Sequence, residues 1–200
     1  MGITPTIDPP SRVSALALEV ARQYLTPALL NHSIRSYAWA VDHADRNRIA
    51  FDAELLYVSA LLHDLGLVPE FDSENVAFEK AGGHVAWAFA AGADWTIERR
   101  NELYKIIVSH MTDDEVEPGS ESELLRVATS LDISGRNAHH WNPETVNDVL
   151  GKVPRLDLGA QFIRCFEAQS RRKPTSAAAS AMRSGIVDLI RANPLDDQHS

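Results

Sequence analysis

The stretch of residues 52–66 reads DAELLYVSALLHDLG and decides the fold. Asp52 can accept hydrogen bonds from the free backbone amides at the start of a helix, and the residues that follow are mostly apolar. Gly66 then predicts a left-handed stop, a common way for a helix to end. Two ionisable side chains, His63 and Asp64, close this apolar helix. The stretch therefore predicts a buried helix whose C-terminal end places two ionisable side chains in the core.

Helical patterning extends over the rest of the chain, and strand signals are nearly absent. No run of alternating β-branched residues is flanked by tight-turn dipeptides, and no heptad repeat is sustained as in a long coiled coil. We therefore predict an all-α fold, an orthogonal bundle of about eight to nine helices. Besides the segment 52–64, helices are expected at about 13–24, 29–45, 78–91, 96–110 and 120–134, shortly after Pro143, and at 156–171 and 175–192.

The composition is that of one globular domain. The chain has 200 residues, of which 44% are hydrophobic and 24% charged, and it shows no repeat or linker. We expect a core over about 13–170, preceded by an N-terminal arm (1–12) and followed by a C-terminal helix (174–192) and a frayed tail (194–200). The apolar last helix could pack against another subunit, so a homo-oligomer is a further expectation.

Charge and hydropathy limit the partners. The formal net charge is −9, whereas nucleic-acid binders need a basic face; the one basic cluster, Arg171, Arg172 and Lys173, is typical of a solvated helix end. No stretch approaches the roughly 20 apolar residues that span a bilayer, and no signal peptide is visible. We therefore expect a small-molecule substrate, no nucleic-acid or membrane partner, and a cytoplasmic location. The single cysteine, Cys165, lies on an apolar helix stripe and is expected in the core.

Ionisable side chains on otherwise apolar helices indicate a metal site. His32 lies near the start of one helix, His63 and Asp64 end another, and Asp132 interrupts an apolar stretch. Each one alone has an ordinary interpretation as a hydrogen-bonded core histidine or a helix cap. A buried charge without a partner is costly, however, and two imidazoles with two carboxylates suit Zn, Fe, Mn, Co or Ni. The sequence therefore predicts that these four side chains hold a divalent transition metal, with room left for water.

The order of these residues, H…HD…D on successive helices, resembles the HD-domain superfamily of metal-dependent hydrolases. The resemblance covers about residues 13–170. It implies the HD-domain helix bundle, the metal ligands His32, His63, Asp64 and Asp132, and zinc as the first candidate ion. The motifs that carry it are NHSIR at 31–35, ALLHDLG at 60–66 and TSLDISG at 129–135.

Within that superfamily the sequence is most similar to the cyanamide hydratase-like branch, whose members add water across a nitrile to make a urea. For this reaction we expect Asp64, or His110 through a water, to take or return protons. We also expect Arg35, His84 and His110 to contact the substrate. The segments that suggest the branch are NHSIRSY at 31–37, FEKAGG at 78–83, IIVSH at 106–110 and SLDISG at 130–135.

These side chains also have alternative interpretations. Arg35 shares a helix face with His32, so its guanidinium could support the metal ligands from behind or orient the substrate; it could instead form a surface salt bridge with Asp42 or Glu54. His84 and His110 could be packed histidines, or they could hold a second metal ion. Weaker site candidates are Glu79 and Asp113; His43, His139, His140 and His199 are expected to be exposed, and Trp39, Trp87, Phe89 and Trp95 to pack in the core.

Two other functions are alternatives to nitrile hydration. A phosphohydrolase acting on a nucleotide or other phosphomonoester would need cationic groups such as Lys80, Arg126 and Arg136, which form no cluster in the sequence. A non-enzymatic ligand-binding module would have a degenerate site, and the complete set of predicted ligands argues against it. Hydration of a nitrile such as cyanamide to a urea is therefore the first hypothesis.

Overall fold

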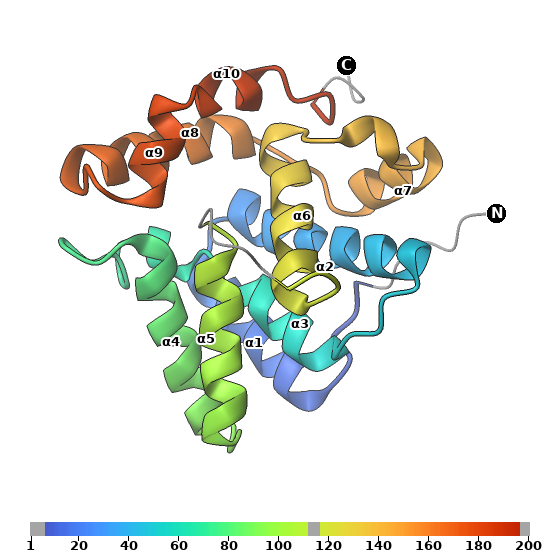
Figure 1. The fold of residues 1–200 in the computed structure, drawn as a ribbon, viewed down its shortest axis with the longest axis vertical. Coiled ribbons are helices and arrows are strands. Elements are labelled where there is room, and N and C mark those ends of the chain that lie inside the picture. Colours follow the sequence, from blue (N-terminus) through green and yellow to red (C-terminus); the bar gives the residue numbers. More distant parts are fainter. Residues whose placement is uncertain (1–6, 112–116, 197–200) are drawn as a thin grey trace.

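The computed structural model describes residues 7–111 and 117–196 (Figure 1). Over these residues the fold is all-helical, as the patterning predicts, and contains no strand. None of the described helices combines the length and the apolar composition needed to cross a bilayer. The helices are α1 (Arg12–Tyr24), α2 (Pro27–Asn47), α3 (Ala53–Leu62), α4 (Phe78–Gly92), α5 (Ile97–Ser109), α6 (Glu121–Ser134), α7 (Pro143–Lys152), α8 (Leu158–Arg172), α9 (Ala177–Arg183) and α10 (Ile186–Arg191), with short 3-10 helices η1 (Leu65–Leu67) and η2 (Ala138–His140).

Helix α3 forms the centre of the bundle and packs against α1, α2, α5 and α6 (Figure 1). Every residue from Leu55 to Leu62 is buried, so this helix has no solvent face. Asp52 caps its first turn as predicted, because its carboxylate accepts a hydrogen bond of 2.9 Å from the Leu55 amide. The two residues that follow the helix, His63 and Asp64, are therefore delivered into the interior.

The other helices surround the end of α3. Helices α2 and α6 pack along each other, and α4 and α5 form a second closely packed pair (Figure 1). The C-terminal helices α8, α9 and α10 form a layer next to α2 and α6. Residues far apart in the sequence thus meet where α2, α6 and the end of α3 come together.

The last predicted helix is two helices. The segment expected to be helical over 175–192 is broken at Gly185, whose φ of 81° lies in the left-handed region that favours glycine. Helix α9 packs on α8, and α10 packs on α6 and α8. Both helices pack against other helices of the same chain. The packing of this segment on another subunit therefore stays a prediction.

The tail that was expected to fray from residue 194 is ordered against the bundle as far as the structure describes it. Leu195 is buried, and Asp196 forms an ion pair with Arg155. Asn193 is buried as well, with its side-chain amide turned toward the end of α6. The frayed tail was therefore a wrong prediction for 194–196, and residues 197–200 lie outside the described part.

Gly66 is needed for close packing and not for a left-handed turn. It lies inside η1 without a positive φ, because the chain leaves α3 through a 3-10 turn. A Cβ atom at this position would lie 2.0 Å from the carbonyl oxygen of Phe78. Gly82 of α4 faces the same contact, since its Cβ would lie 2.9 Å from the His63 carbonyl oxygen. The two glycines let α4 approach the segment that carries His63 and Asp64.

We expect Gly66→Ala to lower the free energy of unfolding by about 2–3 kcal/mol, because the added methyl overpacks a backbone contact. The matched control is Gly92→Ala at the C-terminal end of α4, where a Cβ would meet no atom within 4 Å. That control should be neutral or stabilising by up to about 1 kcal/mol. Urea unfolding of both variants measures the difference; equal stabilities would contradict the close approach.

Candidate metal centre

Three buried side chains bring their ligand atoms to one point. His32 comes from α2, His63 is the C-cap of α3, and Asp64 precedes η1. The two imidazole Nε2 atoms lie 3.2 Å apart, and the Asp64 Oδ2 lies 3.5 Å from the first and 3.3 Å from the second. Two ligands of one ion, each bound at about 2.1 Å, lie roughly 3.0–3.4 Å apart. The spacing of the three atoms fits a shared cation.

Hydrogen bonds at the far side of each ring aim both imidazoles at this point. The Nδ1 of His63 lies 2.7 Å from the carbonyl oxygen of Ala60, which can only accept a hydrogen bond. The Nδ1 of His32 lies 2.7 Å from a carboxylate oxygen of Asp132. Both Nδ1 atoms therefore carry a proton, which leaves the two Nε2 atoms as the nitrogens that can bind a cation. Metal-binding histidines are oriented by such partners.

Asp64 has the environment of a ligand rather than of a hydrogen-bonded core carboxylate. Both of its oxygens are buried, and neither accepts a hydrogen bond within the described part of the chain. Burial raises the pKa of Asp64, but attraction by His63 and then His32 outweighs it and lowers the pKa to about 2. Burial likewise lowers the pKa of His63, but attraction by Asp64 overcomes it and the pKa is raised. The carboxylate thus favours positive charge here, so the donors present fit a divalent cation.

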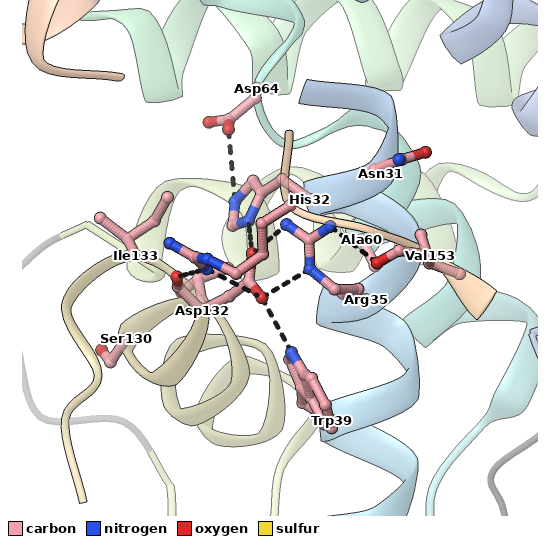
Figure 2. Close-up of polar contacts among 12 residues, drawn as sticks. Asn31, His32, Arg35, Trp39, Ala60, Asp64, Ser130, Asp132, Ile133 and Val153 are labelled. Carbon is pink, nitrogen blue, oxygen red and sulfur yellow. Dashed lines mark hydrogen bonds and ion pairs between the residues drawn. The ribbon is translucent and has the colours of Figure 1, made fainter. Parts of the chain in front are cut away.

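Asp132 lies behind His32 and does not join the other three ligand atoms (Figure 2). Its Oδ1 accepts hydrogen bonds from Arg35 Nε at 2.8 Å and Trp39 Nε1 at 3.0 Å. Its Oδ2 accepts from Arg35 at 2.8 Å and from the Nδ1 of His32. Burial raises the pKa of Asp132, but the Arg35 guanidinium more than offsets it and holds the pKa well below its usual range. The structure therefore brings together three of the four predicted ligands and gives the fourth the role of orienting one of them.

Arg35 is neither a substrate-binding residue nor part of a surface salt bridge in this structure. The side chain is fully buried. Its nitrogens donate to both oxygens of Asp132 and to the carbonyl oxygens of Val153 and Pro154 (Figure 2). Four of its five N–H groups are thus engaged inside the protein. The predicted substrate contact is corrected for this reason, and Arg35 instead holds Asp132 behind His32.

His110 lies beside the centre as predicted. It is the C-cap of α5 and is buried, with its ring centroid 4.8 Å from that of His63. Its Nδ1 donates to the carbonyl oxygen of Ile107, which leaves Nε2 as the nitrogen able to accept a proton. Burial, followed by the neighbouring charge of His63, lowers the pKa of His110 to about 3. This imidazole is therefore neutral.

His84 does not reach the centre, which corrects its predicted substrate contact. The preceding Gly82 and Gly83 face η1 and the ring of Tyr104, so the next position on α4 turns outward. His84 is exposed, with its ring centroid 4.9 Å from that of Tyr104. The second metal ion considered for His84 and His110 together finds no support in this arrangement.

We expect His84→Ala to leave the metal content per chain unchanged and kcat/KM within about twofold of the wild type, as for an ordinary surface substitution. Elemental analysis and steady-state kinetics on the same preparation measure both. A loss of half the bound metal would instead support a two-ion centre that includes His84.

A cavity of about 490 Å³ is lined in part by His32, His63 and His110. Arg126 and Arg136, named as possible phosphate ligands, both line it, whereas Lys80 is exposed and does not. The rest of the wall comes mainly from α6 and from apolar residues of α8, α9 and α10. These are Met111, Val127, Thr129, Ser130, Ile133, Ser134, Asn137, Phe162, Phe166, Ala181 and Ile186.

Sequence reasoning missed three residues that hold Asp132. Trp39 was expected only to pack, but its indole N–H binds the carboxylate; its spacing of four residues from Arg35 put it on the same helix face and could have revealed it. Arg155 and Asn193 both donate to the Asp132 backbone carbonyl. Nothing in their local sequence predicts that contact.

The other candidates lie apart from the site. Glu79 is buried, and one of its carboxylate oxygens has no hydrogen-bond partner in the described residues. His43 is half-buried next to Trp141 rather than exposed. His139 and His140 are exposed as expected, and Asp113 and His199 lie outside the described residues.

Comparison with known proteins agrees with this geometry. Residues 29–138, from α2 to η2, match the HD domain family, and this range contains all four motif residues. Two proteins of Saccharomyces cerevisiae, the cyanamide hydratases DDI2 and DDI3, are each 28% identical to this chain over 179 residues, which cover 86% of the chain and 79% of each relative. The family match spans more than half of the chain, and the chain therefore belongs to the HD-domain family of metal-dependent hydrolases.

Proposed function

We propose that this protein is a metal-dependent enzyme that adds water to the nitrile group of a small molecule such as cyanamide, giving a urea. The observation that carries the proposal is the meeting of His32, His63 and Asp64 at one point, where the two histidines also line a cavity and both Asp64 oxygens lack a hydrogen-bond donor among the described residues. The similarity to two cyanamide hydratases supports the choice of reaction.

The chain's own residues have separate parts in this reaction. His32, His63 and Asp64 would hold a divalent ion, and that ion would supply the Lewis acidity that lowers the pKa of water. In the net reaction the water oxygen bonds to the nitrile carbon, and both water protons end on the former nitrile nitrogen. His110, neutral and with Nε2 available, is placed to accept one proton and return it. Asp132 keeps His32 in the tautomer that binds metal.

A phosphohydrolase is the second candidate, and one observation favours it. Arg126 and Arg136, which form no cluster in the sequence, line the same cavity next to the histidines. Guanidinium groups are suited to phosphate oxygens. The two candidates share a metal centre and differ in the group that is attacked.

The test is to load the purified protein with zinc, manganese, iron, cobalt or nickel and offer cyanamide beside p-nitrophenyl phosphate and nucleoside monophosphates. We expect urea from cyanamide, no phosphate release, and the highest rate with zinc. Phosphate release without urea would favour the second candidate. A protein that retains no metal and converts nothing would contradict enzymatic function. The cytoplasmic location and a homo-oligomeric state stay predictions.

A further inference from the structure

The cavity at the metal centre continues outward over helix α9. A second cavity of about 490 Å³ shares four of its lining residues: Met111, Arg136, Ala181 and Ile186. We call the two cavities together the α6–α9 groove. Pockets for drug-sized ligands measure roughly 300–1,000 Å³, so the groove has room for a ligand far larger than cyanamide.

The charged side chains of the described residues that line the groove are opposite in sign to the net charge of the protein. The chain carries 28 acidic and 19 basic residues. Among the described residues, however, no Asp or Glu lines either cavity, while Arg126 and Arg136 do. Arg136 lies at the junction of the two cavities and is exposed. A cleft lined by one sign of charge concentrates ligands of the opposite sign.

Hydroxyl groups extend the polar lining away from Arg136. Helix α6 contributes Thr129, Ser130 and Ser134 toward the metal side. Toward the outer end the groove is lined by Thr175, Ser176, Ser180 and Ser184, beside the apolar Ile186 and Leu189. Thr129, Ser134 and Ser176 donate their hydroxyl protons to backbone carbonyl oxygens, so the guanidinium near the middle of the groove, rather than these hydroxyls, is the feature that favours an anion.

We propose that the natural substrate is an elongated molecule that carries an anionic group, a carboxylate or a phosphate, bound by Arg136 while its reacting end lies at His32, His63 and Asp64. For the reacting end this inference rests on the proposed function. It makes Arg136 a specificity-determining residue: a guanidinium bound to an anion stabilises long anionic substrates over neutral ones of equal size.

The test compares N-cyano-β-alanine, a cyanamide with a carboxylate tail, with its neutral analogue N-cyano-β-alaninamide. Because Arg136 is exposed and exposed ion pairs are weak, we expect the zinc-loaded wild type to favour the carboxylate by about two- to fivefold in kcat/KM. Arg136→Ala should bring this ratio close to one, and Arg136→Lys should restore part of it. Arg171→Ala is the matched control, because Arg171 is exposed at the end of α8 and lines neither cavity.

A binding measurement separates this inference from the proposed reaction. Calorimetry with the urea products N-carbamoyl-β-alanine, its amide and 2-ureidoethyl phosphate needs no turnover. Tighter binding of either anion, lost in Arg136→Ala, supports the groove even if no cyanamide is converted, and the tighter of the two identifies carboxylate or phosphate. Equal binding of anion and amide by the wild type would overturn the inference even if cyanamide is hydrated.

Discussion

Asp64→Asn is expected to lose the metal and to lower turnover by about a thousandfold. The substitution keeps the size of the side chain but removes the only negative charge among the three converging ligands. The Lewis acid contributes several kcal/mol to the reaction, and each factor of ten corresponds to about 1.36 kcal/mol. Elemental analysis after gel filtration and the rate of urea formation measure the two losses.

Thermal unfolding gives an independent measure of the same change. At a free zinc concentration about 100-fold above Kd, binding stabilises the wild type by about 2.7 kcal/mol. For a chain of this size that corresponds to a rise in Tm of roughly 5–10 °C, which Asp64→Asn should lack. Asp157→Asn, an exposed carboxylate at the start of α8, is the control and should keep the full rise. An Asp64→Asn protein that still binds one zinc per chain would disprove the three-residue centre.

Arg35→Ala is expected to lower the free energy of unfolding by about 3–5 kcal/mol, measured by urea unfolding in the presence of a chelator. Arg35 forms two of the hydrogen bonds to Asp132, and both side chains are completely buried. Removing one partner of a buried pair leaves the other charge uncompensated. In Tm the loss corresponds to roughly 6–20 °C.

The control for Arg35→Ala is the loss of a solvent-exposed ion pair. Lys152→Ala removes an exposed pair with Asp148, at 3.2 Å, and should change stability by less than about 1 kcal/mol. The measurement also decides between two roles for Arg35. If Arg35 bound substrate, its replacement would raise KM and leave the free energy of unfolding nearly unchanged. The buried hydrogen bonds instead predict a large fall in the free energy of unfolding.

Local patterns predicted the helices well because each helix is specified by nearby residues. The apolar run after Asp52, the cap itself and the turn at Pro143 depend only on sequence neighbours, and each was found where predicted. The break at Gly185 was missed, since a glycine inside a helical pattern is tolerated and gives a weak signal. The docked end of the chain was missed because it depends on Arg155, which is distant in sequence.

The candidate site shows the same limit. His63 and Asp64 were predictable because they end a helix without a polar face, and His32 because it completes a metal-binding set. The orientation of His84 and the burial of Arg35 depend on helix packing, which residue spacing alone does not determine. Sequence order identified the chemistry of the side chains but not which of them share one coordination sphere.

The docking of residues 193–196 has a consequence for biosynthesis. Asn193 and Arg155 both reach the backbone carbonyl of Asp132, and Asp196 holds Arg155 in turn. Translation produces these segments after all three metal-binding residues, and a domain generally folds as a unit. The support behind His32 is therefore complete only after residues 193–196 have been synthesised, so the metal centre is expected to reach its full order later than its three ligands are made.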